Sequence, residues 1–262
     1  MPNKASLHLA TIQPASLEAK LYAARTAGFG AVGLIWDEMV EQGEAGVEEV
    51  RLSGIRVSDL SGLSGWMDPD RTWRTMALAR AEQAFELAAN LDCAVVIACP
   101  PSGEIEPLTA AAQFRELCRL AYPYGVRVGL EFVGSFQQVN TLAAAWEIVE
   151  VAEAENSGLV IDSFYFYQGG SSLDMLEPLP GEKISLVQLS DCMALPRYEM
   201  ENRHRVYPGT GVLPLEELLA ALRSKGYSGY YCLELHNEGY WQEDSVVVAR
   251  EGFRSLQRLD LA

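Results

Sequence analysis

Four side chains that carry oxygen atoms each follow directly on a short apolar run in the second half of the chain. They are Glu131, Asp162, Gln188 and Glu234. The runs are continuously apolar and are separated by helical patterns, which predicts consecutive buried parallel strands. In an eight-stranded α/β barrel, chemistry lies at the carboxyl ends of the strands. Three carboxylates that converge there repel one another strongly, so we expect a divalent cation between them.

The four side chains would surround this cation with oxygen atoms alone. A divalent ion among three carboxylates leaves a single negative charge uncompensated, which a partly buried site tolerates. Hard oxygen ligands suit Mg²⁺ or Mn²⁺ better than zinc, which prefers nitrogen and sulfur. An acid at one strand end is commonly a helix cap or half of a salt bridge. Four such residues on four consecutive strands favour a metal site, and we predict all four as ligands.

The rest of the chain repeats the same alternation of strand and helix. Predicted strands lie at 7–12, 31–36, 55–60, 94–98, 128–131, 159–162, 184–188 and 230–234. Predicted helices lie at 16–28, 40–52, 72–91, 110–122, 141–154, 173–176, 215–225 and 245–259. Eight units in 262 residues are about 33 residues each, the size of a βαβ step. The pattern predicts a single-domain (β/α)8 TIM barrel over residues 1–262.

Two longer segments, residues 62–70 and 192–211, show neither a strand pattern nor a helix pattern. Both follow a predicted strand, so we expect them on the catalytic face as candidate substrate loops. A doubly wound open sheet is the alternative architecture. It would need a Gly-rich phosphate-binding turn after the first strand, and no such turn follows residues 7–12.

Composition narrows the classes of partner. The formal net charge of −16 argues against nucleic acid and against anionic membrane surfaces, because both need basic patches. No apolar run approaches the roughly 18–20 residues of a membrane span, and the first residues do not read as a signal peptide. The five cysteines are odd in number and form no CxxC pair. That pattern suits reduced thiols, and we expect a cytoplasmic protein.

The sequence resembles the sugar phosphate isomerase/epimerase family, whose members are xylose-isomerase-like TIM barrels. The matching segments are Gly129–Glu131, Ile161–Phe164, Val187–Asp191, Arg205–Gly211 and Leu233–Glu234. The resemblance covers nearly the whole chain. It implies that the four predicted ligands hold one divalent metal ion, which in this family is Mn²⁺, Mg²⁺ or Co²⁺.

Within this family, two branches are the most similar. Gln188, where other members have histidine, resembles the hydroxypyruvate isomerases and the 3-dehydroshikimate dehydratases. Segments Arg203–Gly209 and Leu235–Tyr240 resemble the dehydratases most. Two departures separate the chain from that branch. Tyr165 stands where many members have histidine, and Ser58–Ser64 lacks the arginines with which dehydratases hold a substrate carboxylate.

The resemblance implies removal of a proton next to a carbonyl group. A metal ion that binds the carbonyl oxygen offsets the charge that develops there. Two carboxylates on opposite sides of the substrate can then take and return the proton. Glu131 and Glu234 follow the fifth and eighth strands, which lie across the barrel from each other. We predict that they are both metal ligands and the catalytic acid–base pair.

Further residues are candidates for binding the substrate. They are Arg205, Tyr165, His204, His236 and Trp36. The planar guanidinium of Arg205 could orient a hydroxyl, carboxylate or phosphate of the substrate; the alternative is a surface salt bridge. The histidines could assist proton transfer or be ordinary loop residues. The tyrosine could donate a hydrogen bond, and the tryptophan could pack against a sugar or within the core. His8, on the first strand, faces either the barrel interior or a helix.

Three functions follow from these observations. The first is a metal-dependent isomerase or epimerase that acts on a small sugar or polyhydroxy carbonyl compound. The second is a 3-dehydroshikimate dehydratase-like lyase, and the third is a catalytically weakened barrel that binds a sugar. A zinc endonuclease, also known in this broad family, would need a histidine cluster and a basic face, whereas the chain has three histidines. Homodimers and homotetramers are common among such barrels.

Overall fold

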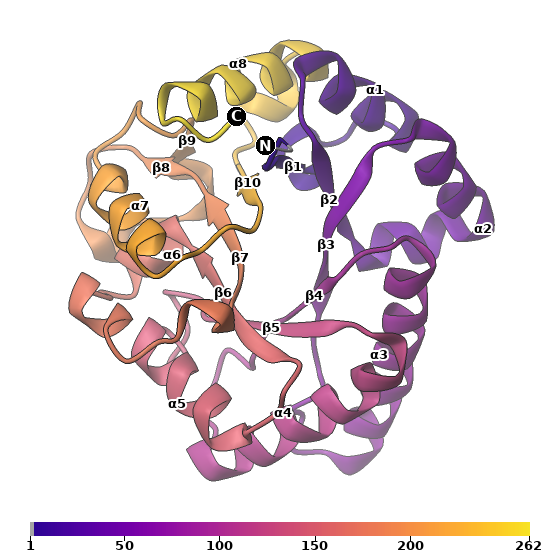
Figure 1. The fold of residues 1–262 in the computed structure, drawn as a ribbon, viewed down its shortest axis with the longest axis vertical. Coiled ribbons are helices and arrows are strands. Elements are labelled where there is room, and N and C mark those ends of the chain that lie inside the picture. The colour runs from indigo at the N-terminus through magenta and orange to yellow at the C-terminus, as the bar shows by residue number, and fades with distance from the viewer. Residues whose placement is uncertain (1–2) are drawn as a thin grey trace.

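Eight short parallel strands form the centre of the computed structural model, which describes residues 3–262. They close into a barrel in the order β1-β2-β3-β4-β5-β6-β7-β10, with β10 paired to β1 (Figure 1). The strands are β1 Ala5–His8, β2 Ala31–Ile35, β3 Arg56–Leu63, β4 Val95–Ala98, β5 Arg127–Glu131, β6 Ser157–Asp162, β7 Ile184–Leu189 and β10 Tyr231–Leu233. The predicted TIM barrel is confirmed.

Helices surround the barrel as an outer ring (Figure 1). They are α1 Leu17–Ala27, α2 Trp36–Ser53, α3 Arg71–Asn90, α4 Pro107–Ala121, α5 Leu142–Ala152, α6 Ser163–Gln168, α7 Leu215–Ser224 and α8 Ser245–Arg258. Several begin at a side-chain cap of the kind that starts helices. The Ser16 hydroxyl accepts a bond from the amide of Ala19, and the Asp244 carboxylate accepts bonds from two amides of α8.

One helix was not predicted. Residues 173–176 form a short helix as expected, of the 3-10 type, but β6 is followed first by α6, which begins at Ser163. The Asp162 side chain caps α6 by accepting a bond from the Tyr165 amide, so the chain turns into helix directly at the strand end. The helix predicted to begin at residue 40 begins at Trp36 instead.

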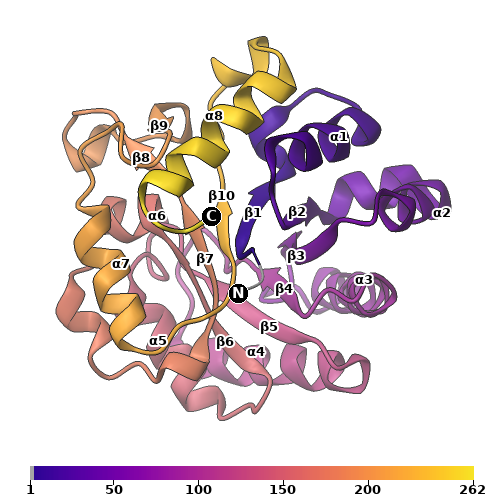
Figure 2. The same cartoon turned by 45° about the horizontal axis from the view of Figure 1, so that its top comes forward.

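The segment 192–211, predicted to be irregular, contains regular structure. β8 (Asp191–Cys192) pairs antiparallel with β9 (Arg205–Val206), with 3-10 turns between them. In both views this pair lies between α7 and α8 and outside the barrel strands (Figures 1 and 2). Asp191 stabilises the returning chain, because its carboxylate accepts bonds from the backbone amides of Gly209, Gly211 and Leu213.

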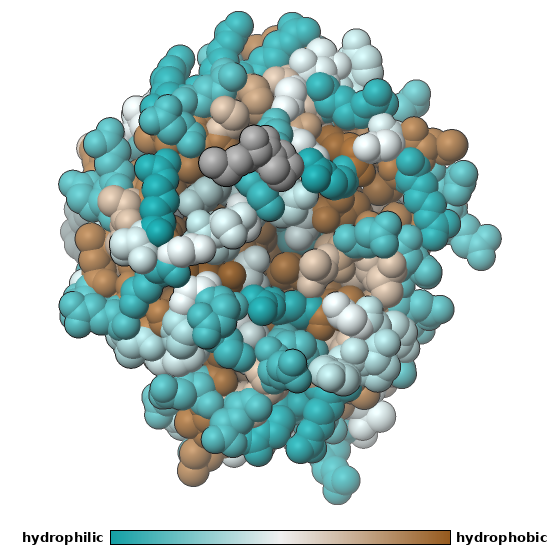
Figure 3. All heavy atoms as spheres, in the orientation of Figure 1, coloured by the Kyte–Doolittle hydropathy of each residue, from teal (hydrophilic) through white to brown (hydrophobic). Residues whose placement is uncertain are grey.

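The hydrophobic core has two parts, as expected of such a barrel. A small cluster of Ile97, Val160, Leu186 and Cys232 fills the barrel interior. A larger one packs the outer faces of the strands against the helices. Hydrophilic residues and residues of intermediate hydropathy cover most of the face seen in Figure 3, with hydrophobic residues between them. Among residues 3–262, no helix has the length and apolar character needed to cross a membrane.

Candidate metal centre and active site

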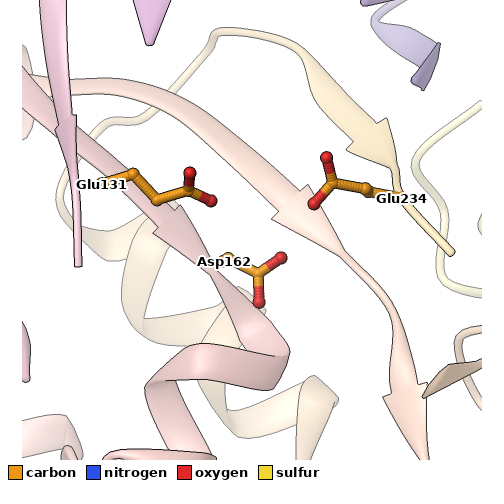
Figure 4. Close-up of side chains that lie close together, drawn as sticks. All are labelled: Glu131, Asp162 and Glu234. Carbon is orange, nitrogen blue, oxygen red and sulfur yellow. The ribbon is translucent and has the colours of Figure 1, made fainter. Parts of the chain in front are cut away.

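Three acidic side chains point toward one another at one end of the barrel (Figure 4). Glu131 and Asp162 end β5 and β6, and Glu234 follows directly on β10. One carboxylate oxygen from each lies within 4.8 Å of the others. Their exposed fractions are 7%, 0% and 4%. Because parallel strands end at one face, residues that are far apart in sequence meet here.

Gln188 completes this group from β7. Strand register places it beside Asp162 on one side and Cys232 on the other. Its amide nitrogen donates a hydrogen bond to Glu234 Oε1 at 3.1 Å. Its Oε1 is buried and has no hydrogen-bond partner among the described residues. A buried acceptor without a donor calls for a missing partner, and a cation beside three carboxylates fits that requirement.

The three acids differ in their electrostatic environment. Burial raises the pKa of Glu131 well above its ordinary value, and the charges of Glu234 and Asp162 raise it further. Burial also raises the pKa of Asp162, against the opposing effect of Arg205. Burial acts in the same direction on Glu234, but His8 and His236 outweigh it and leave its pKa below the ordinary value. Without a cation, protonation therefore favours Glu131 over Glu234.

Arg205 lies against two of the acids, Asp162 and Glu234, and is fully buried. Its guanidinium donates to Asp162 Oδ2 at 2.7 Å and to Ser190 Oγ at 3.1 Å, and it stacks over the rings of Phe164 and Tyr165. The β8–β9 pair holds it there. The predicted substrate-binding arginine is thus an internal counter-charge for Asp162, and it does not line the cavity above the acids.

Two histidines lie against one oxygen of Glu234, whereas Arg205 lies 3.8 Å from the other. His8 Nδ1 lies 3.2 Å and His236 Nε2 lies 3.4 Å from Glu234 Oε1. The His8 ring is 2% exposed, and its Nε2 is bonded to Ser61 Oγ at 2.9 Å. His8 therefore faces the site, a placement that the sequence left open. No signal in the sequence pointed to this placement, because the first strand was predicted over 7–12, whereas β1 ends at His8 and residues 9–12 form a 3-10 helix.

A cavity of about 570 Å³ opens above the carboxylates, large enough for a small ligand. Of the predicted substrate-binding residues, Tyr165 and His236 line it, whereas His204 and Trp36 do not. His204 accepts a bond from the Glu201 amide in a 3-10 turn, and Trp36 lines a separate cavity of about 240 Å³. The lining residues that sequence reasoning missed include His8, Ser61, Cys99, Ser135, Gln168, Glu201 and Asn202.

Two of the lining groups are hydrogen-bond donors rather than bases. Burial raises the pKa of the Tyr165 phenol, so the hydroxyl stays protonated at neutral pH. Burial likewise raises the pKa of the Cys99 thiol, which points to Glu131 Oε2 at 3.6 Å. Tyr165 cannot serve as the proton acceptor that a histidine at this position would provide.

Comparison with known proteins agrees with this architecture. A family described as "Xylose isomerase-like TIM barrel" matches residues 21–259, so the chain belongs to the xylose isomerase-like TIM barrel family. It is 36% identical over 177 residues to an inosose isomerase of Halalkalibacterium halodurans, covering 64% of this chain and 63% of the relative. It is 34% identical over 188 residues to a 3-dehydroshikimate dehydratase of Pseudomonas aeruginosa, covering 70% and 30%.

A solved structure shows the same fold. The crystal structure of the IOLI protein with a bound zinc atom superposes with a TM-score of 0.87 at 25% identity, covering 98% of this chain and 96% of that one. The chain spans less than two thirds of the length of the two enzymes above. The resemblance to the dehydratases is confirmed, and the inosose isomerases extend the set of relatives.

Proposed function

We propose that this protein is a divalent-metal-dependent isomerase or epimerase of a small, uncharged polyhydroxy carbonyl compound. The observation that carries the proposal is the group of three converging carboxylates beside the unpartnered Oε1 of Gln188. The relatives named as inosose isomerases support the substrate class, because an inosose is a cyclic polyhydroxy ketone. The cavity above the acids has the size for one such ring.

Glu131, Asp162, Gln188 and Glu234 would hold the metal ion. When bound, it would act as a Lewis acid that polarises the substrate carbonyl. Oxygen-only ligands favour Mn²⁺ or Mg²⁺, with Co²⁺ as a further candidate, although the related IOLI structure contains zinc. Arg205 stays bonded to Asp162 and limits the negative charge of the group.

Glu131 and Glu234 would transfer the proton. In one direction, the Glu234 carboxylate removes the proton from the carbon beside the carbonyl, since its histidine neighbours keep it ionised. Glu131, at the end of β5, would return a proton from the other side. The reverse reaction exchanges the two roles. Tyr165 and Ser61 offer hydroxyl groups that can orient the hydroxyls of the ring.

The charge of the cavity favours an isomerase over a dehydratase. Among the described residues, its lining includes no lysine and no arginine, and Glu201 adds a further acid. Arg205 is committed to Asp162. A substrate carboxylate or phosphate would therefore be desolvated beside acids without a lysine or arginine to pair with. A lyase remains the second candidate because of the similarity to the dehydratase. The lyase hypothesis predicts activity on a substrate that carries a carboxylate.

The test follows proton exchange in D₂O by NMR. Metal-stripped protein is reloaded with Mn²⁺ or Mg²⁺ and incubated with inososes, ketoses and 3-dehydroshikimate; Mg²⁺ samples are read directly. We expect metal-dependent exchange next to the carbonyl of a neutral substrate, and Glu234→Gln should reduce it by at least about 100-fold while the fold is kept. Exchange that is unchanged in Glu234→Gln would contradict the assignment. New aromatic signals from 3-dehydroshikimate, whose loss of water gives a dihydroxybenzoate, would instead identify a lyase.

A further inference from the structure

A buried carboxylate outside the proposed metal centre lies on β3. Asp59 is 0% exposed, and its Oδ1 accepts a hydrogen bond from Ser58 Oγ at 2.6 Å. Its Oδ2 has no nitrogen or oxygen hydrogen-bond partner among the described residues. This atom faces His8, whose Nε2 lies 3.9 Å away. Burying an acid with an incomplete set of partners costs free energy, so the carboxylate is expected to have a role.

Gly33 lies between these two side chains. In the strand register it pairs with His8 of β1 on one side and with Asp59 of β3 on the other. A Cβ at residue 33 would lie 2.7 Å from Asp59 Oδ2 and 2.7 Å from His8 Cδ2. The absence of a side chain therefore leaves the gap through which carboxylate and imidazole approach each other across β2.

A register shift makes this alignment. Val32 pairs with Val57, yet the next residue, Gly33, pairs with Asp59, so Ser58 is the extra residue on β3. An inserted residue of this kind changes which side chains face the barrel interior. Without the shift, Ser58 would occupy the position opposite Gly33. The shift and the glycine thus act together to place an acid behind His8.

The opposite edge of the His8 ring faces Glu234, the proposed catalytic base. Nδ1 lies 3.2 Å from Glu234 Oε1, and the amide of Ala10 lies 3.4 Å from the same nitrogen. Nε2 is bonded to Ser61 Oγ at 2.9 Å. The ring is therefore held at its far edge by Ser61, with Asp59 Oδ2 3.9 Å away, while its near edge faces Glu234. Such outer contacts commonly orient the groups that bind a metal.

We propose that Asp59 is a positioning residue. Through the gap at Gly33 it orients the His8 ring, which in turn fixes the Glu234 carboxylate for metal binding and proton transfer. The inference takes only one point from the proposed function, the role of Glu234 in metal binding and proton transfer. Asp59 itself touches neither substrate nor metal.

The test uses the small number of histidines. Since the chain has three, the imidazole NMR signals of the metal-free protein can be assigned with one His→Gln variant each. We expect Asp59→Asn and Gly33→Ala to shift the His8 signals and leave His204 unchanged. Gly103→Ala is the matched control, because a Cβ there has nothing within 4 Å. Mn²⁺ affinity should fall about 10-fold in both test variants, and kcat should fall more than KM changes.

Wild-type His8 signals and Mn²⁺ affinity in Asp59→Asn would overturn the inference. If that variant does not fold, Gly33→Ala decides by the same two measurements. The NMR measurement needs neither metal nor substrate. A His8 shift in a protein that is inactive on every polyol would therefore contradict the proposed function and support the positioning of His8 by Asp59.

Discussion

At the scale of single residues, the site depends on how a few buried charges are compensated. Asp162 has both carboxylate oxygens engaged, one by the Tyr165 amide and one by Arg205. Glu234 Oε1 meets two histidines and the Gln188 amide. One oxygen from each of the three acids lies within 4.8 Å of the others, and Gln188 Oε1 has no hydrogen-bond partner among the described residues. A cation between the three acids would offset their negative charge.

The Arg205–Asp162 pair allows a stability prediction at this scale. Both side chains are 0% exposed, so Arg205→Met would leave a buried carboxylate without its counter-charge. We expect a loss of about 3–5 kcal/mol in the free energy of unfolding of the metal-free protein. Arg80→Met is the matched control, because Arg80 pairs with Asp37 at the surface, where the loss should be below about 1 kcal/mol. Urea denaturation measures both. Equal losses in the two variants would contradict the account.

Sequence reasoning at this scale selected the four candidate ligands because each follows a short apolar run, and three of them, the acids, lie close together in the structure. It could not locate Arg205, which reaches Asp162 only because the β8–β9 pair turns back over the strand ends. It also gave Asp59 no role, since its relation to His8 depends on a register shift that no local pattern reveals. The contacts of both residues join strands that are distant in the sequence.

At the scale of elements, the strands were predictable because short apolar runs between helices leave few alternatives. The helix after β6 was not, because a six-residue helix shows too little periodicity and owes its start to the Asp162 cap. The same reasoning explains why α4 begins at Pro107, earlier than predicted. Glu106 caps it by accepting bonds from the amides of Leu108 and Thr109.

The Glu106 cap predicts a pH dependence. Its backbone hydrogen bonds hold the pKa of Glu106 below the ordinary value of 4.5. The ionised cap therefore stabilises the fold above that pH, and this stabilisation is lost as pH falls through the lower, folded-state pKa. We expect Glu106→Ala to lower Tm more at pH 7 than at about pH 3. Thermal unfolding of Glu104→Ala, an exposed acid of the same loop, provides the control. If the loss of Tm in Glu106→Ala were the same at both pH values, a role for the charge of Glu106 would be contradicted.

At the scale of the whole molecule, the closed barrel brings His8 of the first strand beside Glu234, which follows the last. The sequence predicted this closure from eight repeated units, and the pairing of β1 with β10 confirms it. Closure sets the distances within the site: acids from β5, β6 and the end of β10 meet within 4.8 Å. The shape and charge of the cavity could not be predicted, because its walls combine residues of β1, β2, β3 and α6 with residues of the loops after β4, β5, β8 and β10.

The central claim is that Glu131, Asp162, Gln188 and Glu234 bind one divalent metal ion. Calorimetric titration of Mn²⁺ into chelator-stripped protein tests it most directly, beside a Glu131→Gln, Glu234→Gln double variant that keeps side-chain size and removes two charges. We predict one ion bound per chain in the wild type and at least about 100-fold weaker binding in the double variant. Absence of binding to the wild type, or equal affinity in both proteins, would contradict the claim.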